Sequence, residues 1–133
     1  MTNGTNSYAV THCLGMRGID MKPAVFNRVA HAAGVLHKAF RASAKEPSKV
    51  KSFWRLTEAG HAYAVEVEND RTPEPVVQYL DGRFDDLLAF LQPTIDVMVR
   101  EGEITPVARD HEKGEAYRRQ FQAQQHKQTG EQF

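Results

Sequence analysis

The sequence predicts a small α+β domain, mainly α-helical, built from two short N-terminal helices, a hairpin and a longer helix. Apolar residues recur at helical spacing in two places, near residues 25–33 and 84–99. Between them lie two stretches with the alternation of β-strands, at 36–42 and 50–56. A length of 133 residues with 41% hydrophobic residues supports one domain with a modest core.

The N-terminal part is predicted to hold two helices joined by a glycine turn. Residues 7–16 form a short helix that ends at Gly15, and Gly18 allows a tight connection. The second helix spans 20–34, with Asp20 as N-cap, Pro23 in the first turn and Gly34 as the stop signal. Its apolar stripe faces a core, and its other face carries polar side chains.

A hairpin follows the second helix. The strands 36–42 and 50–56 are joined by a polar loop, and alternation places Val50, Ser52, Trp54 and Leu56 on the face suited to a core. The other face of the second strand is basic and carries Phe53. Trp54 is therefore expected to pack in the core rather than to stack on bases.

The second half is predicted to add helices around one more strand. Thr57 caps a helix from Glu58 to about Val67, although residues 64–67 also fit a strand. After a proline-containing linker and a short strand at 76–80, an amphipathic helix follows, which Pro93 should kink or split. The stretch from residue 111 is polar, and we expect a frayed helix or disorder there.

The chain has zero formal net charge, but its charges are segregated. From Arg17 to Arg55 nine Lys and Arg stand against two acids, and from Glu58 to Glu103 eleven acids stand against three Lys and Arg. Such a distribution creates a strong local field despite the neutral total. The simpler alternative is a chance segregation of solvated surface charges.

The order helix, glycine turn, helix, basic hairpin, helix is that of a winged helix-turn-helix domain, and residues 8–65 resemble one family of them. The chain is similar to the DNA-binding-type module of phage antirepressors and other mobile-element regulators. The matching residues are Leu14-Gly15-Met16, Asn27, Gly34-Val35-Leu36, Trp54 to Gly60, and Tyr63-Ala64. The resemblance implies a two-stranded wing at the hairpin and binding to double-stranded DNA. The residues beyond it are expected to form a C-terminal helical extension.

On this interpretation the 20–34 helix reads DNA and the hairpin follows the phosphates. Side chains three to four positions apart on a helix can reach base edges in the major groove, and basic side chains of the wing contact phosphates. The predicted DNA-binding residues are Lys22, Asn27, Arg28, His31, Lys38, Arg41, Lys45, Lys49, Lys51 and Arg55. The alternative is that the helix presents a plain solvated face.

The predicted domain organisation is a winged helix-turn-helix at 1–70, a helical extension at 71–110 and a polar tail at 111–133. The extension has an apolar stripe that either completes the core or forms a homodimer or partner interface: Phe84, Leu87, Leu88, Leu91, Ile95 and Met98. A second function is also open, in which the acidic half binds a basic partner protein, as an anti-defence or antirepressor-type inhibitor would.

Enzymatic motifs are not found in the sequence. Cys13 follows His12 directly, but neighbouring helical residues point about 100° apart, and a lone cysteine is usually a core residue. The histidines lack metal-ligand spacing, and no glycine-rich phosphate loop is present. We therefore expect a non-enzymatic protein without cofactor or metal. The lack of a secretory signal, membrane span or disulfide pair predicts a cytoplasmic location.

Overall fold

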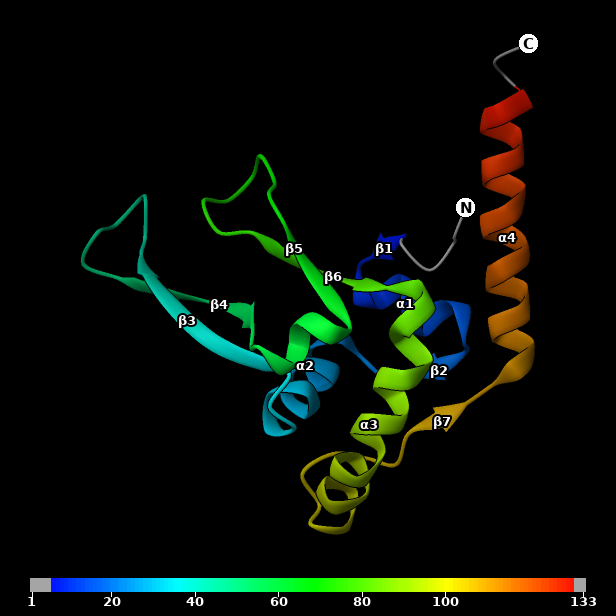
Figure 1. Cartoon of the computed structure of the whole chain (residues 1–133), viewed down its shortest axis with the longest axis horizontal. Helices are drawn as coiled ribbons and strands as arrows, with labels where there is room; N and C mark the ends of the chain where they lie inside the picture. Colours follow the sequence, from blue (N-terminus) through cyan, green and yellow to red (C-terminus); the bar gives the residue numbers. More distant parts are fainter. Residues whose placement is uncertain (1–5, 131–133) are drawn as a thin grey trace.

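A computed structural model describes residues 6–130, and side chains up to residue 125. Within this range the chain forms four α-helices, one 3-10 turn and seven short strands in three small sheets. In Figure 1, α2 and α3 lie at the centre, two hairpins extend to one side, and α4 runs along the opposite edge. The predicted α+β class, mainly helical, is observed, but the arrangement differs from the prediction.

The N-terminal elements each pair with a distant part of the chain. Strand β1 (Ser7–Tyr8) pairs antiparallel with β6 (Val76–Leu80), and β2 (Ile19–Asp20) pairs with β7 (Ala108–Arg109). Helix α1 (Val10–Met16) lies between β1 and β2, and α2 (Pro23–Ala32) follows β2. The N-cap position of α2 is Lys22, because Asp20 is engaged in β2 rather than in capping.

The two hairpins follow one another along the chain. Strands β3 (Leu36–Ala42) and β4 (Val50–Leu56) pair antiparallel over their whole length, with the predicted bounds. A 3-10 turn (Ala59–Ala62) leads into β5 (Ala64–Val67), which pairs with β6. The helix predicted to 67 is therefore wrong beyond the first turn, and the strand alternative holds for 64–67. The N-cap position of the 3-10 turn is Glu58 rather than Thr57, although the Thr57 hydroxyl accepts a hydrogen bond from the Gly60 amide at 3.1 Å.

Helix α3 (Asp81–Arg100) begins directly after β6 and runs through Pro93 without a break. The predicted split is absent because Pro93 lies on the exposed side of the helix, where water can satisfy the carbonyl that its missing N–H leaves free. Helix α4 (His111–Gly130) follows β7.

One core joins both halves of the chain. Residues of α1, α2, β3, β6 and α3 pack in a single cluster, which includes Cys13, Phe26, Tyr79 and Phe84. The rings of Phe26 and Phe84 stack at 5.7 Å, and each meets Tyr79 edge-on. The predicted boundary at residue 70 falls in the β5–β6 loop, with core residues on both sides of it.

The apolar stripe of α3 completes this core. Phe84, Leu87, Leu91, Ile95 and Met98 are buried, and Leu88 is half-buried against them. The homodimer or partner interface predicted for these six residues needs correction, because the side chains are covered by the chain's own α2 and β-strands. The core-completion alternative accounts for them.

The winged helix-turn-helix prediction is wrong. In that fold the second helix would follow the first through a tight turn and pack on it, whereas here β2 separates α1 from α2. Helix α1 packs chiefly against α4, and α2 packs against α3. The chain thus lacks a paired helix-turn-helix in its described part, and the β3–β4 hairpin is no wing of one.

The glycines that suggested the turn have another role. Gly18 has φ +65°, and a Cβ there would lie 1.8 Å from the Asp110 carbonyl oxygen. A Cβ on Gly15 would lie 2.7 Å from the ring of Tyr117 in α4. Both glycines therefore make room for the chain segment that enters α4, and the Asp110 amide donates to the Gly18 carbonyl at 2.7 Å.

Candidate nucleic-acid interface on the β3–β4 hairpin

The β3–β4 hairpin, called the arm below (residues 36–56), projects from the body (Figure 1). Its register aligns Lys38 with Trp54, Phe40 with Ser52 and Ala42 with Val50, so these residues share one face, called the outer face. The other face, called the clamped face, carries the pairs His37–Arg55, Ala39–Phe53 and Arg41–Lys51. The predicted alternation of β4 is confirmed, but only Leu56 of the predicted inward face is fully buried.

Two arginines of the clamped face bind the neighbouring β5–β6 hairpin. Arg55 Nε donates to Glu66 at 2.6 Å and its Nη2 donates at 3.0 Å, and Arg41 Nε donates to Glu74 at 2.7 Å. The Arg55 hydrogen bond holds the pKa of Glu66 below its usual value, and Arg41 does the same for Glu74. These charge-assisted pairs fix the arm to the body. Arg41 and Arg55 are consequently neutralised and do not form part of a free cationic surface.

The lysines of the arm face solvent. Lys38 Nζ lies 5.1 Å from the ring centre of Trp54, a cation–π contact on the outer face. Lys45 and Lys51 are exposed, and Lys49 forms an exposed ion pair with Glu46 at 3.1 Å. The Ser43 hydroxyl accepts hydrogen bonds from the amides of residues 45 and 46, which orders the turn that presents Lys45. Four lysines are therefore distributed along an ordered projection whose own sequence contains only one acid, Glu46.

Helix α2 does not offer the predicted reading face. Asn27 is half-buried and lines a groove with Trp54 and Val77, while Lys22 sits exposed before the first turn. Arg28 points to the loop after α3, where it donates to the Glu103 carbonyl at 3.2 Å. Of the predicted helix residues, His31 contacts the arm through its ring, which lies 5.3 Å from that of Trp54. The ten predicted DNA-binding residues therefore do not form one continuous surface.

Trp54 sits where the arm meets the body. It is half-buried against the core, and its ring is bracketed by His31 and Lys38. The expectation that Trp54 serves packing is confirmed in part, since one side of the ring borders the groove with Asn27. This ring therefore contacts both α2 and the arm.

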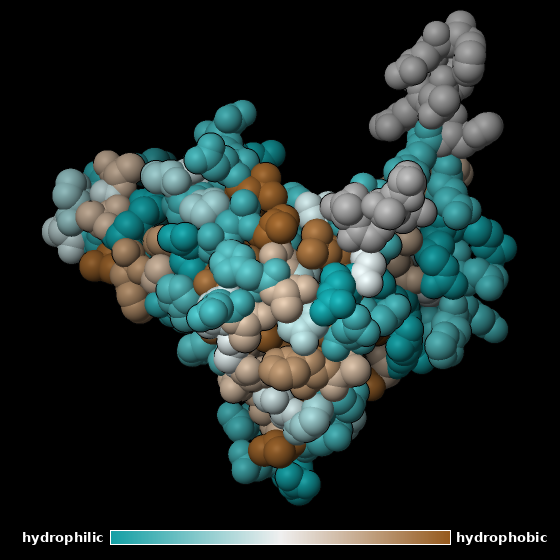
Figure 2. Space-filling view, in the orientation of Figure 1, coloured by the Kyte–Doolittle hydropathy of each residue, from teal (hydrophilic) through white to brown (hydrophobic). Residues whose placement is uncertain are grey.

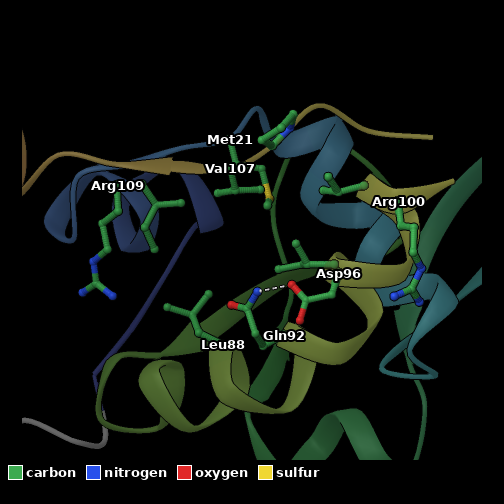
Figure 3. A pocket seen from close by; sticks show the side chains of 11 residues that line it. Met21, Leu88, Gln92, Asp96, Arg100, Val107 and Arg109 are labelled. Atoms are coloured by element: carbon green, nitrogen blue, oxygen red, sulfur yellow. Dashed lines mark hydrogen bonds between the residues drawn. The ribbon is translucent and has the colours of Figure 1, made fainter. Parts of the chain in front are cut away.

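A second hollow lies between α3 and the β2–β7 pair. It has a volume of about 400 Å³ and is lined by apolar side chains from both layers, including Met21, Leu88 and Val107. Figure 3 shows Gln92 donating to Asp96 on α3, with Arg100 and Arg109 at the two ends of the hollow. The hollow therefore has apolar walls, with side chains of both charges at its margin.

His12 and Cys13 have separate environments. His12 Nδ1 lies 3.0 Å from the Tyr117 hydroxyl, whereas the Cys13 thiol faces the carbonyl of Tyr79 in the core. Burial raises the pKa of Cys13 to about 11, so the group is a thiol at neutral pH. Over residues 6–125 no cluster of three His, Cys, Asp or Glu side chains has the geometry to hold a metal ion.

The acidic partners of the arm were not found from the sequence. Glu66 and Glu74 lie 11 and 33 residues from their arginines, and only the packing of the two hairpins brings them together. Phe40 was also missed, because alternation alone does not show where along a projecting strand the core ends. The sequence showed only that Glu66 and Glu74 carry a charge opposite to that of the arm.

Comparisons with known proteins find no matching family model, and no significant match among curated proteins or solved structures. Among the helices of the described residues, none has the length and apolarity needed to cross a membrane.

Proposed function

We propose that this protein is a non-enzymatic nucleic-acid-binding protein that contacts duplex DNA through the arm. The observation that supports this most strongly is the ordered two-stranded projection with four lysines and one acid. Ribbons of this kind enter DNA grooves in several unrelated DNA-binding proteins. The regulatory role implied by the resemblance to mobile-element regulators is part of the proposal.

The arm is suited to phosphate contact for an electrostatic reason. Its arginines hold it to the body, while its four lysines are exposed to solvent: Lys38, Lys45, Lys49 and Lys51. Each lysine that neutralises a phosphate releases a condensed counterion, which favours binding at low salt. Contacts of this type position a protein on DNA but carry no sequence information.

Sequence reading by α2 is not part of the proposed function. Asn27 lines a groove within the protein and Arg28 is engaged with the loop after α3. A homodimer is still a prediction, but it no longer has the α3 stripe as its interface. Binding is therefore proposed to be governed by charge and DNA shape.

The test is fluorescence anisotropy with a short labelled DNA duplex. The double variant Lys45→Glu/Lys51→Glu should bind at least about 100-fold more weakly than the unchanged protein at low salt, because each lost contact costs about tenfold. The matched control is Lys113→Glu, an exposed lysine in α4, compared with the single arm variant Lys45→Glu, which makes the same change of charge. An equal effect of the control and the arm variant would refute the arm as the contact surface.

A second candidate function is binding of a basic partner protein at the hollow beside α3. The observation that favours it is the apolar floor next to Asp96, on a helix with an acidic exposed side. The two candidates differ on immobilised heparin, a phosphate-like polyanion. Under the first, the arm variant loses retention at low salt; under the second, it elutes like the unchanged protein.

A further inference from the structure

Two large apolar side chains are exposed near the end of the arm. Phe40 is 64% exposed and Val50 is 67% exposed. Phe40 lies opposite Ser52, and Val50 lies opposite Ala42. These are consecutive pairs of the outer face, so Phe40 and Val50 are diagonal neighbours. Figure 2 shows apolar surface over the hairpin at the left end of the molecule.

The described part of the chain, residues 6–125, leaves this face open. The clamped face meets the β5–β6 hairpin through Arg41 and Arg55, and the outer face lies on the other side of the ribbon. Trp54, further along the outer face, is half-buried against the body, whereas Phe40 and Val50 lie beyond the reach of α2. Exposing both side chains costs solvation free energy that a partner would recover.

The charges around the two side chains fit a polyanion. Lys38 precedes Phe40 on the same face, and Lys45 lies in the connecting turn. Lys49 and Lys51 are the chain neighbours of Val50, and Lys51 belongs to the clamped face. An apolar tip with lysines in its turn and on both faces of the ribbon matches the surface that DNA offers in a groove, with phosphates at the rims and stacked bases at the floor. Proteins that bind DNA in this way insert apolar side chains between base steps and partly unstack them.

We propose that Phe40 and Val50 insert at a base step of the DNA held by the arm and unstack it, an inference that rests on the proposed function. The lysines supply the attraction to phosphates, and the two apolar side chains supply the distortion. Unstacking a base step costs free energy. DNA in which this cost has been met in advance, by a mismatch, should therefore bind more tightly than a fully paired duplex.

The experiment compares two short duplexes of the same sequence, one fully paired and one with a central mismatch, each with 2-aminopurine beside the central step. The unchanged protein should bind the mismatched duplex about tenfold more tightly and should raise 2-aminopurine fluorescence in the paired one. Phe40→Ala should bind the paired duplex within about threefold of the unchanged protein, since every lysine is kept, but should lose both effects. Phe90→Ala, an exposed phenylalanine on α3, is the matched control and should change neither.

The outcomes separate this inference from the proposed function. Tight, salt-sensitive binding without mismatch preference or a 2-aminopurine signal would overturn the insertion and leave the proposed function standing. Loss of both effects in Phe90→Ala as well as in Phe40→Ala would also overturn it. Absence of binding to either duplex would overturn both proposals. Binding to anionic lipid vesicles that depends on Phe40, without 2-aminopurine enhancement, would assign the apolar tip to a membrane surface instead.

Discussion

Substitution of Gly15 by alanine tests whether this glycine of α1 makes room for α4. At a solvent-exposed position inside a helix, Gly→Ala increases stability by about 1 kcal/mol. Here the added methyl would lie 2.7 Å from Cε2 and 2.9 Å from Cδ2 of Tyr117, both inside van der Waals contact. Overpacking of this kind costs about 1–3 kcal/mol. Gly15→Ala should therefore range from neutral to about 2 kcal/mol destabilising in the unchanged background.

The same substitution should change sign when the ring is removed. In a Tyr117→Ala background nothing opposes the helix-propensity gain, so Gly15→Ala should stabilise by up to about 1 kcal/mol. The coupling between the two sites is then about 1–3 kcal/mol. Urea unfolding of the four proteins, followed by circular dichroism, measures it. Equal effects of Gly15→Ala in both backgrounds would show that α4 does not pack on α1 as described.

Three further predictions concern the core and the ion pairs of the clamped face. The pKa of Glu66 is held low by its hydrogen bond from Arg55, so the pair stabilises the fold fully above the ordinary glutamate pKa and loses its effect as pH falls through the lowered native value. Thermal unfolding at several pH values measures the difference in stability between the unchanged protein and Glu66→Gln, and this difference should shrink as the pH falls. A difference that grows in acid would contradict the Arg55–Glu66 pair. Leu91→Ala should cost about 2–5 kcal/mol while leaving the sedimentation behaviour unchanged, because Leu91 is buried within one chain; dissociation of an oligomer by this variant would restore the interface prediction. Cys13, with its pKa raised to about 11 by burial, should react with iodoacetamide at neutral pH only in denaturant, and fast modification of the native protein would exclude the buried position.

Local patterns predicted the arm well. Alternation over 36–42 and 50–56 and the glycine at 34, which has φ +84°, define the β3–β4 hairpin and the end of α2 as observed. Strand 76–80 and the apolar stripe of α3 were likewise readable, because both depend on short-range periodicity.

The arrangement of the elements was not predictable in the same way. Strand β2 consists of two residues, Ile19 and Asp20, whose partner β7 lies about 90 residues further along the chain. Nothing local distinguishes glycines that form a helix-turn-helix turn from Gly15 and Gly18, which leave space for α4. The sequence pattern therefore identified the right residues as special and assigned them the wrong partners.

The candidate site was predicted in part for the same reason. The lysines of the arm were identified from charge and alternation, whereas the neutralisation of Arg41 and Arg55 depends on a tertiary contact between two hairpins. Arg28 and Asn27 occupy the expected side of a helix, but that side meets other parts of the chain. Helical spacing shows which residues share a face and does not show what covers it.

The salt dependence of DNA binding tests the role of the arm most directly. If Lys38, Lys45, Lys49 and Lys51 each neutralise one phosphate, the slope of log K against log salt is about −3.6, and affinity falls about 150-fold between roughly 50 and 200 mM salt. For Lys45→Gln/Lys51→Gln the slope should be about −1.8 and the fall about 12-fold. Identical slopes for the two proteins would contradict the assignment of DNA binding to the arm.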